Sequence, residues 1–238
     1  MKPLAIDLFC GLGGWTEGLL AEGYEVVGFD IERHDYGEHR YPAQLVLQDV
    51  LTLHGRQFNG ASLIVASPPC QAYSYRAMPW KRAKALPPPD NSLFEACFRI
   101  QQEAREAANW PIPMVVENVK GAQPWVGRSR WNFGSFHLWG DVPALMPMTS
   151  ARKNQGGSWF NIGSPDQKVL GQNPVHDGVK NRDVDGYERK HPNAFGWKVP
   201  RTSSHSKARK AASAMIAKIP LPLARHIART YAPREECK

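Results

Sequence analysis

The stretch Leu4–Gly14, LAIDLFCGLGG, joins a short apolar run to a turn that contains three glycines. An apolar run of this length, bounded by glycine, is typical of a buried β-strand. Apolar side chains then recur at helical spacing, which predicts a helix over residues 11–21. Glycines in such a turn let the backbone approach a ligand closely, and the start of the helix favours polar or anionic groups.

Further short apolar runs follow, and each ends at polar or proline residues. We predict strands over 25–29, ending at Asp30, over 63–66, ending at Ser67-Pro68-Pro69, and over 114–116, ending at Glu117-Asn118. The clearest helix is predicted over 92–109, where Ser92 and Glu95 form a capping box. Strands alternating with helices predict an α/β fold, a doubly wound Rossmann-like sheet.

The rest of the chain is less periodic. Residues 76–90 combine cations with three consecutive prolines, which predicts an exposed, mobile loop. Residues 141–205 are rich in Gly, Asn, Pro and cations, which predicts a small irregular region. Residues 206–231 return to a helical pattern, interrupted at Pro220 and Pro222. We therefore expect three parts, over 1–140, 141–205 and 206–238.

Charge is divided unevenly along the 238 residues. Residues 1–150 carry 13 basic and 15 acidic side chains, whereas residues 151–238 carry 17 basic and 7 acidic ones. With 42% hydrophobic residues the chain can build a core, so disorder is not expected. A strongly basic back half predicts a polyanionic partner, and nucleic acid is the first candidate.

The cysteine spacing and the hydropathy pattern suggest the compartment. The four cysteines form no CxxC pair, which fits a reducing cytoplasm and argues against a zinc site. No apolar run is long enough for a membrane helix, and no secretory signal is apparent. We expect a cytoplasmic protein of a bacterial host cell, without a metal or a membrane, and a monomer.

Three groups of reactive or polar residues stand at predicted strand ends: the turn after Asp7, Cys70 after Pro68-Pro69, and Glu117 after residues 114–116. In parallel sheets, ligands bind outside the carboxyl ends of the strands. Each group has an ordinary alternative: a tight turn without a ligand, a small buried thiol, or a surface acid. The glycine turn alone suits dinucleotides and S-adenosylmethionine equally.

Taken in order, these groups resemble the DNA cytosine-5 methyltransferase family. The resemblance covers most of residues 4–140 and reappears near 212–228; residues 127–131, GRSRW, are most similar to phage or prophage members. It implies S-adenosylmethionine as cofactor, double-stranded DNA as substrate, and a catalytic domain over 1–140. The implied cofactor-binding residues are Asp7, Phe9, Gly11, Gly13, Asp30, Ile31, Asp49, Pro69 and Leu93.

The resemblance implies covalent catalysis by Cys70. Carbon 5 of cytosine is a poor nucleophile until a thiolate adds to carbon 6. A free cysteine titrates near ~8.5, so we expect nearby cations to help form the thiolate. The resemblance implies that Glu117 holds the exocyclic amine and N3 of the base, where negative charge develops. The base must leave the duplex, and we expect Gln71 and Ser74 to fill the vacated space. Phosphate contacts are expected from Lys81, Arg82 and Lys84.

Two departures from the family pattern stand out. Arg128 and Arg130 match the arginine spacing of the family motif QxRxR, which implies that Arg130 contacts cytosine and Arg128 supports the site. Val126 stands where the glutamine is expected, and Ile216-Ala217 replaces a Gly-Asn pair near the last motif.

Target recognition would come from residues 141–205, whose small size predicts a recognition sequence of about two to four base pairs. Several other functions remain open. The same motifs occur in the tRNA-modifying branch of the family, so RNA is an alternative substrate. A nucleic-acid-binding protein with a dead site would need Cys70 or Glu117 to be missing or misplaced. A nicotinamide oxidoreductase rests on the glycine turn alone.

Overall fold

The computed structural model describes residues 2–36, 39–77, 81–146, 214 and 217–233. The chain divides into two units, and all elements of the main sheet belong to the one that comprises residues 1–34, 40–149 and 219–238. The described residues include only 141–146 of the predicted recognition region over 141–205. In the predicted C-terminal helices, residues 206–213, 215 and 216 also lie outside the described part.

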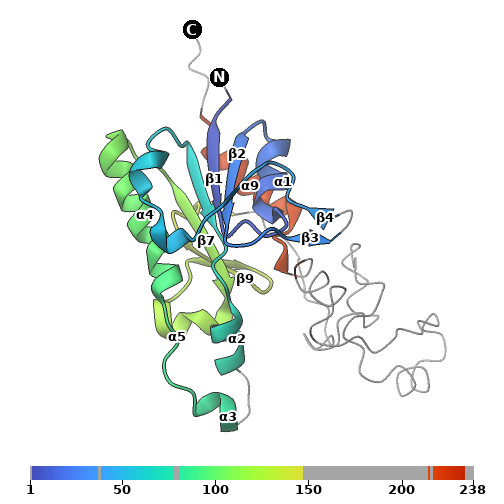
Figure 1. The fold of residues 1–238 in the computed structure, drawn as a ribbon, viewed down its shortest axis with the longest axis vertical. Coiled ribbons are helices and arrows are strands. Elements are labelled where there is room, and N and C mark those ends of the chain that lie inside the picture. The colour runs from blue at the N-terminus through green and yellow to red at the C-terminus, as the bar shows by residue number, and fades with distance from the viewer. Residues whose placement is uncertain (1, 37–38, 78–80, 147–213, 215–216, 234–238) are drawn as a thin grey trace, which may run out of the picture. The chain divides into compact units, whose positions relative to one another are not determined.

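A mixed α/β architecture is found, as predicted (Figure 1). The strands are β1 (Leu4–Leu8), β2 (Glu25–Asp30), β3 (Asp35–Tyr36), β4 (His39–Arg40), β5 (Gln44–Leu47), β6 (Leu63–Ala66), β7 (Met114–Val119), β8 (Trp131–Phe133) and β9 (Phe136–Gly140). The α-helices are α1 (Gly14–Ala21), α2 (Gln71–Arg76), α3 (Lys81–Lys84), α4 (Ser92–Ala108), α5 (Gln123–Val126) and α9 (Leu221–Tyr231). Short 3-10 helices are η1 (Val50–Thr52), η2 (Gly55–Phe58) and η3 (Lys120–Ala122).

The main sheet has the strand order β5-β2-β1-β6-β7-β9-β8. The first five strands are parallel, and β9 runs antiparallel to both β7 and β8. β3 and β4 pair in a separate two-stranded sheet. Since the five parallel strands end at one edge, the segments that follow β1, β2, β6 and β7 converge there, and a doubly wound sheet of this kind binds ligands at that edge.

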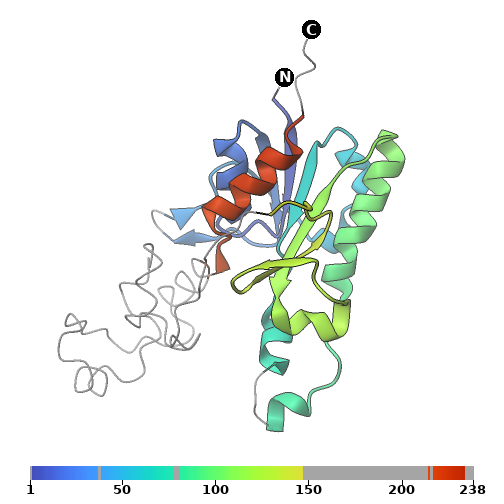
Figure 2. The ribbon, with the colours of Figure 1, turned by 180° about the vertical axis from the view of Figure 1, so that it is seen from behind.

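Helices cover both faces of the sheet (Figures 1 and 2). On one face, α4 buries Phe94, Cys97 and Ile100 against strand side chains such as Ile64 and Val116. On the other face, α1 and α9 pack together over the sheet, in a cluster that contains Trp15, Leu19, Val65, Leu223 and Ile227. Central strands buried on both sides explain why their sequences are continuous apolar runs rather than alternating ones.

Several predicted boundaries are wrong in detail. The strand predicted over 114–116 continues to Val119, because β9 pairs with it from Val115 to Val119, and Glu117 and Asn118 therefore lie within β7. The capping box also fails: Asn91 is the N-cap of α4, without a side-chain cap bond, and Ser92 is already helical. The Ser92 N–H instead donates to Asp90 Oδ1 at 2.8 Å.

Residues 76–90 are not simply a loop. Short helices α2 and α3 occupy parts of this segment, and Ala83 is buried. Arg76 ties it together, since its guanidinium donates to the carbonyls of Pro87 and Ala72, both at 2.8 Å. The interruption predicted at Pro220 is confirmed, because Pro220 is extended and α9 begins at Leu221. The interruption predicted at Pro222 is wrong, because this proline lies in the first turn of α9, where it leaves no helical hydrogen bond unmade.

Candidate active site

The glycine turn after β1 is held to the end of β2. Gly11 N–H donates to Asp30 Oδ2 at 2.8 Å, and Cys10 N–H donates to the Phe29 carbonyl at 3.1 Å. Gly11 has φ +51°, Gly13 has φ +77°, and the neighbouring Phe9 has φ +58°. A positive φ at an aromatic residue is uncommon, and such strain clusters at ligand-binding turns.

This turn meets the requirements of a ligand cradle. A side-chain carbon added at Gly11 would meet no atom within 4 Å, so its backbone faces open space. Hydrogen bonds from the backbone of Gly11 and Glu32 and from His34 keep the pKa of the Asp30 carboxyl below its ordinary value, although burial opposes this shift. An ionised carboxylate beside an open glycine turn is suited to ribose hydroxyls.

Apolar side chains stand unusually exposed at the same edge. Ile31 directly follows Asp30 and is 74% exposed, and Leu47, the register partner of Asp30 on β5, is 52% exposed. Leu51 in η1 is 46% exposed, while Asp49 caps this helix by accepting from the Leu51 N–H at 2.9 Å. Exposed aliphatic side chains beside a carboxylate suit a flat heterocycle, so these residues fit the adenosine part of S-adenosylmethionine.

The remaining predicted cofactor residues take different positions. Asp7 is buried at 1% exposure behind the turn, and its Oδ2 accepts from the Thr16 hydroxyl at 2.6 Å. Within the described part of the chain, its other oxygen, Oδ1, has no hydrogen-bond partner. Pro69 is exposed, and Leu93 is half-buried in the first turn of α4. A direct contact between any of these three residues and a cofactor stays a prediction.

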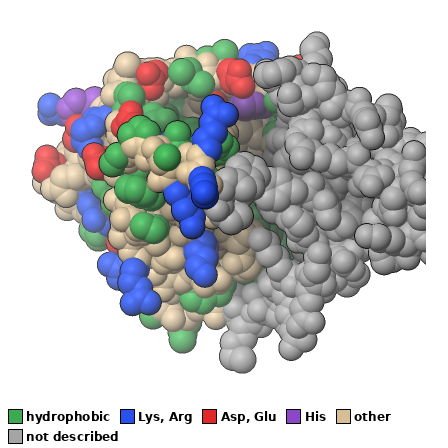
Figure 3. All heavy atoms as spheres, turned by 90° about the horizontal axis from the view of Figure 1, so that it is seen from below, with side chains coloured by type: hydrophobic (Ala, Val, Ile, Leu, Met, Phe, Trp, Pro, Cys, Tyr) green, Lys and Arg blue, Asp and Glu red, His purple; other side chains and the backbone are tan. Residues whose placement is uncertain are grey.

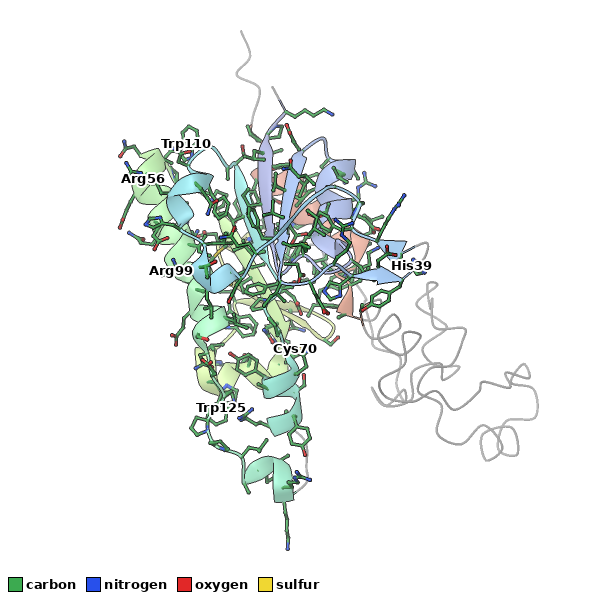
Figure 4. All side chains as sticks on the ribbon, viewed as in Figure 1. His39, Arg56, Cys70, Arg99, Trp110 and Trp125 are labelled. Carbon is green, nitrogen blue, oxygen red and sulfur yellow. The ribbon has the colours of Figure 1, made fainter. Side chains whose placement is uncertain are left out.

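Cys70 precedes α2, just beyond the end of β6 (Figure 4). Burial raises the pKa of its thiol, a hydrogen bond with the Ser74 side chain lowers it, and the nearby Glu117 carboxyl raises it. No cation contributes to the shift. The expected help from nearby cations is therefore not found among the described residues, and the group beside this thiol is a serine hydroxyl.

Glu117 is the second buried acid of the site. It is 9% exposed, and burial raises its pKa from 4.5 to about 8, partly opposed by a hydrogen bond with the Ser67 side chain. Ser67 Oγ also accepts from the Trp15 indole N–H at 3.0 Å. Glu117 is therefore a neutral carboxylic acid at pH 7, able to donate a hydrogen bond.

Asn118 joins the two reactive segments. It is buried, its Nδ2 donates to the Pro68 carbonyl at 2.9 Å, and its Oδ1 accepts from the Val119 N–H at 2.8 Å. This amide fixes the proline loop that leads to Cys70 against the strand that carries Glu117. The roles of Asn118, Ser67 and Trp15 were not predicted, because a local sequence pattern does not show which distant group a buried polar side chain meets.

The predicted DNA-contacting residues lie at the same end of the sheet. Gln71 in α2 is exposed and Ser74 is half-buried, while Lys81, Arg82 and Lys84 are exposed in α3. Arg128 and Arg130, in the segment before β8, are also exposed. Seen from this end, Lys and Arg side chains lie among hydrophobic ones, with Asp and Glu mostly toward the margins (Figure 3). Such a surface suits a polyanion.

The described residues contain neither a candidate metal site nor a candidate membrane span. Within the described ranges, no group of three or more His, Cys, Asp or Glu side chains could hold a metal ion. Among the helices of the described part, none has the length and apolar character to cross a membrane.

Solved structures similar to this chain include several methyltransferases. A candidate DNA modification methyltransferase encoded within a prophage of E. coli is 25% identical, with a TM-score of 0.38, and the alignment covers 53% of this chain and 35% of that one. The S. pombe Dnmt2 methyltransferase is 18% identical, with a TM-score of 0.34 and coverages of 52% and 36%. The Entamoeba histolytica methyltransferase EhMeth is 15% identical, with a TM-score of 0.29 and coverages of 53% and 41%.

The chain thus spans about a third to two fifths of the length of these structures. Among curated proteins, none matches the sequence significantly. The family model of the C-5 cytosine-specific DNA methylases matches residues 4–124, slightly more than half of the 238 residues. This match includes the glycine turn, Cys70 and Glu117. The chain belongs to the C-5 cytosine-specific DNA methylase family.

Proposed function

We propose that this protein methylates carbon 5 of cytosine in double-stranded DNA, through a covalent adduct of Cys70 with a base turned out of the duplex. The observation that carries the proposal is the pairing of a thiol with a neutral acid on neighbouring strands: Cys70 follows β6, and Glu117 lies in β7. Glu117 is near enough to raise the pKa of Cys70.

The chemistry begins with the base. The Glu117 carboxylic acid donates a hydrogen bond to N3, and its carbonyl oxygen accepts from the exocyclic amine. As the Cys70 sulfur forms a bond to carbon 6, electron density moves toward N3 and carbon 5, and the acid at N3 stabilises this charge. The thiol must lose its proton for this addition, and Ser74, which lowers its pKa, is the group placed to favour that loss.

S-adenosylmethionine, when bound, supplies an electrophilic methyl group. The chain's own residues would hold it at the glycine turn: Gly11 offers an open backbone, Asp30 an ionised carboxylate, and Ile31 an exposed aliphatic surface. After methylation, water takes the proton from carbon 5 and the Cys70 sulfur departs from carbon 6 as a thiolate, which restores the aromatic ring. The thiolate then takes up a proton from solvent.

The division of the chain follows from this function. We propose that residues 1–140 form the catalytic domain, that 141–205 read the target, and that 206–238 return to the catalytic domain. The small size of the middle region supports a recognition sequence of about two to four base pairs. Methylating a random DNA library and sequencing the modified sites tests this length, and one long specific site would contradict it.

The decisive experiment traps the covalent step. The full chain is mixed with S-adenosylmethionine and duplex DNA that contains 5-fluorocytosine, which has no proton to release from carbon 5. We expect an adduct that survives denaturation in the wild type and is absent in Cys70→Ala. Cys97→Ala is a matched control, because Cys97 in α4 is fully buried in the core and its thiol is not exposed to DNA. No adduct on DNA, together with methyl transfer to transfer RNA, would assign the chain to RNA instead.

A further inference from the structure

Position 126, where the family motif has a glutamine, holds a valine that packs against the core. Val126, the last residue of α5, is half-buried and packs against the core on the α4 face of the sheet. The two arginines that complete the motif nevertheless follow at the expected spacing. Something else must therefore hold the segment that carries Arg128 and Arg130.

Gln123, the first residue of α5, reaches that segment. Its Oε1 accepts from the Ser129 N–H at 3.2 Å and from the Ser129 hydroxyl at 3.3 Å. Gln123 lies one helical turn before position 126, and from there its side-chain amide oxygen contacts Ser129, the residue between the two arginines. One side-chain oxygen satisfies both a backbone donor and a side-chain donor of Ser129.

His137 completes this contact from the neighbouring strand. His137 Nδ1 lies 2.8 Å from Ser129 Oγ. Since Ser129 Oγ donates to Gln123, it is free to accept from His137 when Nδ1 carries the proton. Burial, together with Lys120, lowers the pKa of His137, which favours the neutral ring with one N–H to donate.

The same segment is tied to the strands of the active site. The Trp139 indole donates to the Gly127 carbonyl at 2.9 Å, and the Arg130 N–H donates to the Leu138 carbonyl at 2.8 Å. Leu138 on β9 is the register partner of Glu117 on β7. The backbone of Arg130 is therefore fixed to β9, and β9 is the strand that pairs with β7 at Glu117, the acid that would hold the base.

We propose that Gln123 is a positioning residue that stands in for the glutamine absent at position 126. By fixing Ser129 together with His137, it directs the flanking side chains of Arg128 and Arg130 toward the base bound at Glu117. This inference rests on the proposed function, because it assigns the two arginines to the substrate cytosine.

Gln123→Met tests the proposal, since it keeps the length of the side chain and removes the accepting oxygen. We expect kcat to fall about 100-fold, the effect of a misplaced group near the reacting atoms. The dissociation constant for S-adenosylmethionine and the melting temperature should stay close to wild type. Gln123→Glu keeps an accepting oxygen and should recover most of the loss. Gln102→Met is the matched control, because Gln102 is exposed on α4 and bonds only to Glu106 among the described residues.

Amide hydrogen exchange separates this inference from the proposed function. Gln123→Met should lose protection at the Ser129 amide even without substrate, and Gln123→Glu should retain it. An inactive wild type on DNA and RNA would reject the proposed function. A Gln123→Met enzyme with wild-type kcat, or one that loses cofactor binding and thermal stability together, would overturn the positioning role.

Discussion

In the proposed mechanism, the protonation of Glu117 limits the pH range in which the site is active. Burial raises the pKa of its carboxyl to about 8, so the acid carries its proton at neutral pH. The protonated form is the one that can donate to N3 of cytosine. The usual preference of glutamate for the ionised state is thus reversed by removing the side chain from water.

We therefore expect kcat/KM for methyl transfer to stop rising near pH 8, the pKa of Glu117 in the folded protein, because above that pH the loss of the protonated acid offsets the gain in Cys70 thiolate. The measurement is a pH–rate profile of methyl transfer under single-turnover conditions. Below pH 8 the rate should rise as Cys70 ionises, so a buffer series from pH 6 to 10 should show a rise followed by a plateau. A rate that rises steadily to pH 10 would remove the acid role of Glu117.

The same shift lowers stability at alkaline pH. The folded protein keeps a proton on Glu117 between pH 4.5 and about 8, while the unfolded chain releases it, so the free energy of unfolding falls as pH rises across that window. Gln cannot ionise. Glu117→Gln should therefore melt at a higher temperature than wild type at pH 8.5, with a smaller difference at pH 4.5. Equal differences at both pH values would show that Glu117 is not desolvated.

Cys70 should be a slow thiol in the free protein. Burial and Glu117 both raise its pKa, and Ser74 lowers it. Since only the thiolate is alkylated, iodoacetamide should label Cys70 more slowly than a free cysteine at pH 8. Ser74→Ala should slow the labelling further, as followed by mass spectrometry of the peptide with Cys70. Faster labelling in Ser74→Ala would mean that the hydroxyl only covers the sulfur.

Among the elements, α9 is fixed to α1 by close contact. A side-chain carbon added at Gly18 would lie 2.3 Å from the Ala224 side chain and 2.7 Å from the Arg225 nitrogen. Beside this contact, Glu22 accepts from Arg225 at 2.5 Å and from Arg229 at 2.7 Å. The glycine is therefore required for the approach of the two helices.

Gly18→Ala should displace α9 and lower the stability of the fold by about 1–3 kcal/mol, the usual cost of overpacking. Chemical denaturation of the full chain measures this loss. Gly60→Ala is the matched control, since an added carbon there meets nothing within 4 Å and its φ is not positive. Equal stability of both variants would show that α9 does not rest on α1 in solution.

For the molecule as a whole, the distribution of charge bears on the proposed binding to DNA. The net basic charge belongs to residues 151–238, while α3 adds Lys81, Arg82 and Lys84 beyond α2, the helix that follows Cys70 (Figure 1). Asp and Glu outnumber Lys and Arg over residues 1–150, so α3 is a local exception there. Phosphate contacts of this kind make affinity strongly dependent on salt.

Replacing Lys81, Arg82 and Lys84 by Gln should weaken DNA binding and lower the slope of log K against log salt concentration by about 1 for each lost phosphate contact. Fluorescence anisotropy with labelled duplex DNA at several salt concentrations measures the slope. Arg56→Gln is the control, because Arg56 lies at the opposite end of the sheet from Cys70 (Figure 4). An unchanged slope in the triple variant would place α3 away from the phosphates.

By itself, the sequence determined the alternation of strands and helices, the parallel sheet, and the placement of Asp30 and Cys70 at strand ends. These features rest on local hydrophobic periodicity and on glycine and proline, which act over a few residues. For the same reason it could not predict that β9 would extend β7 past Glu117, since that strand pairing depends on a hairpin more than fifteen residues away.

Only the tertiary structure decided the protonation of the reactive groups and the hydrogen bonds that hold them in place. The pKa of Glu117 depends on burial by the whole fold, and Asn118 gains its role from the Pro68 carbonyl, 50 residues away in the chain. Gln123 likewise became relevant because a helix and a hairpin bring it to Ser129. Desolvation and long-range hydrogen bonds exist only once distant segments are packed together, which is why no local pattern encodes them.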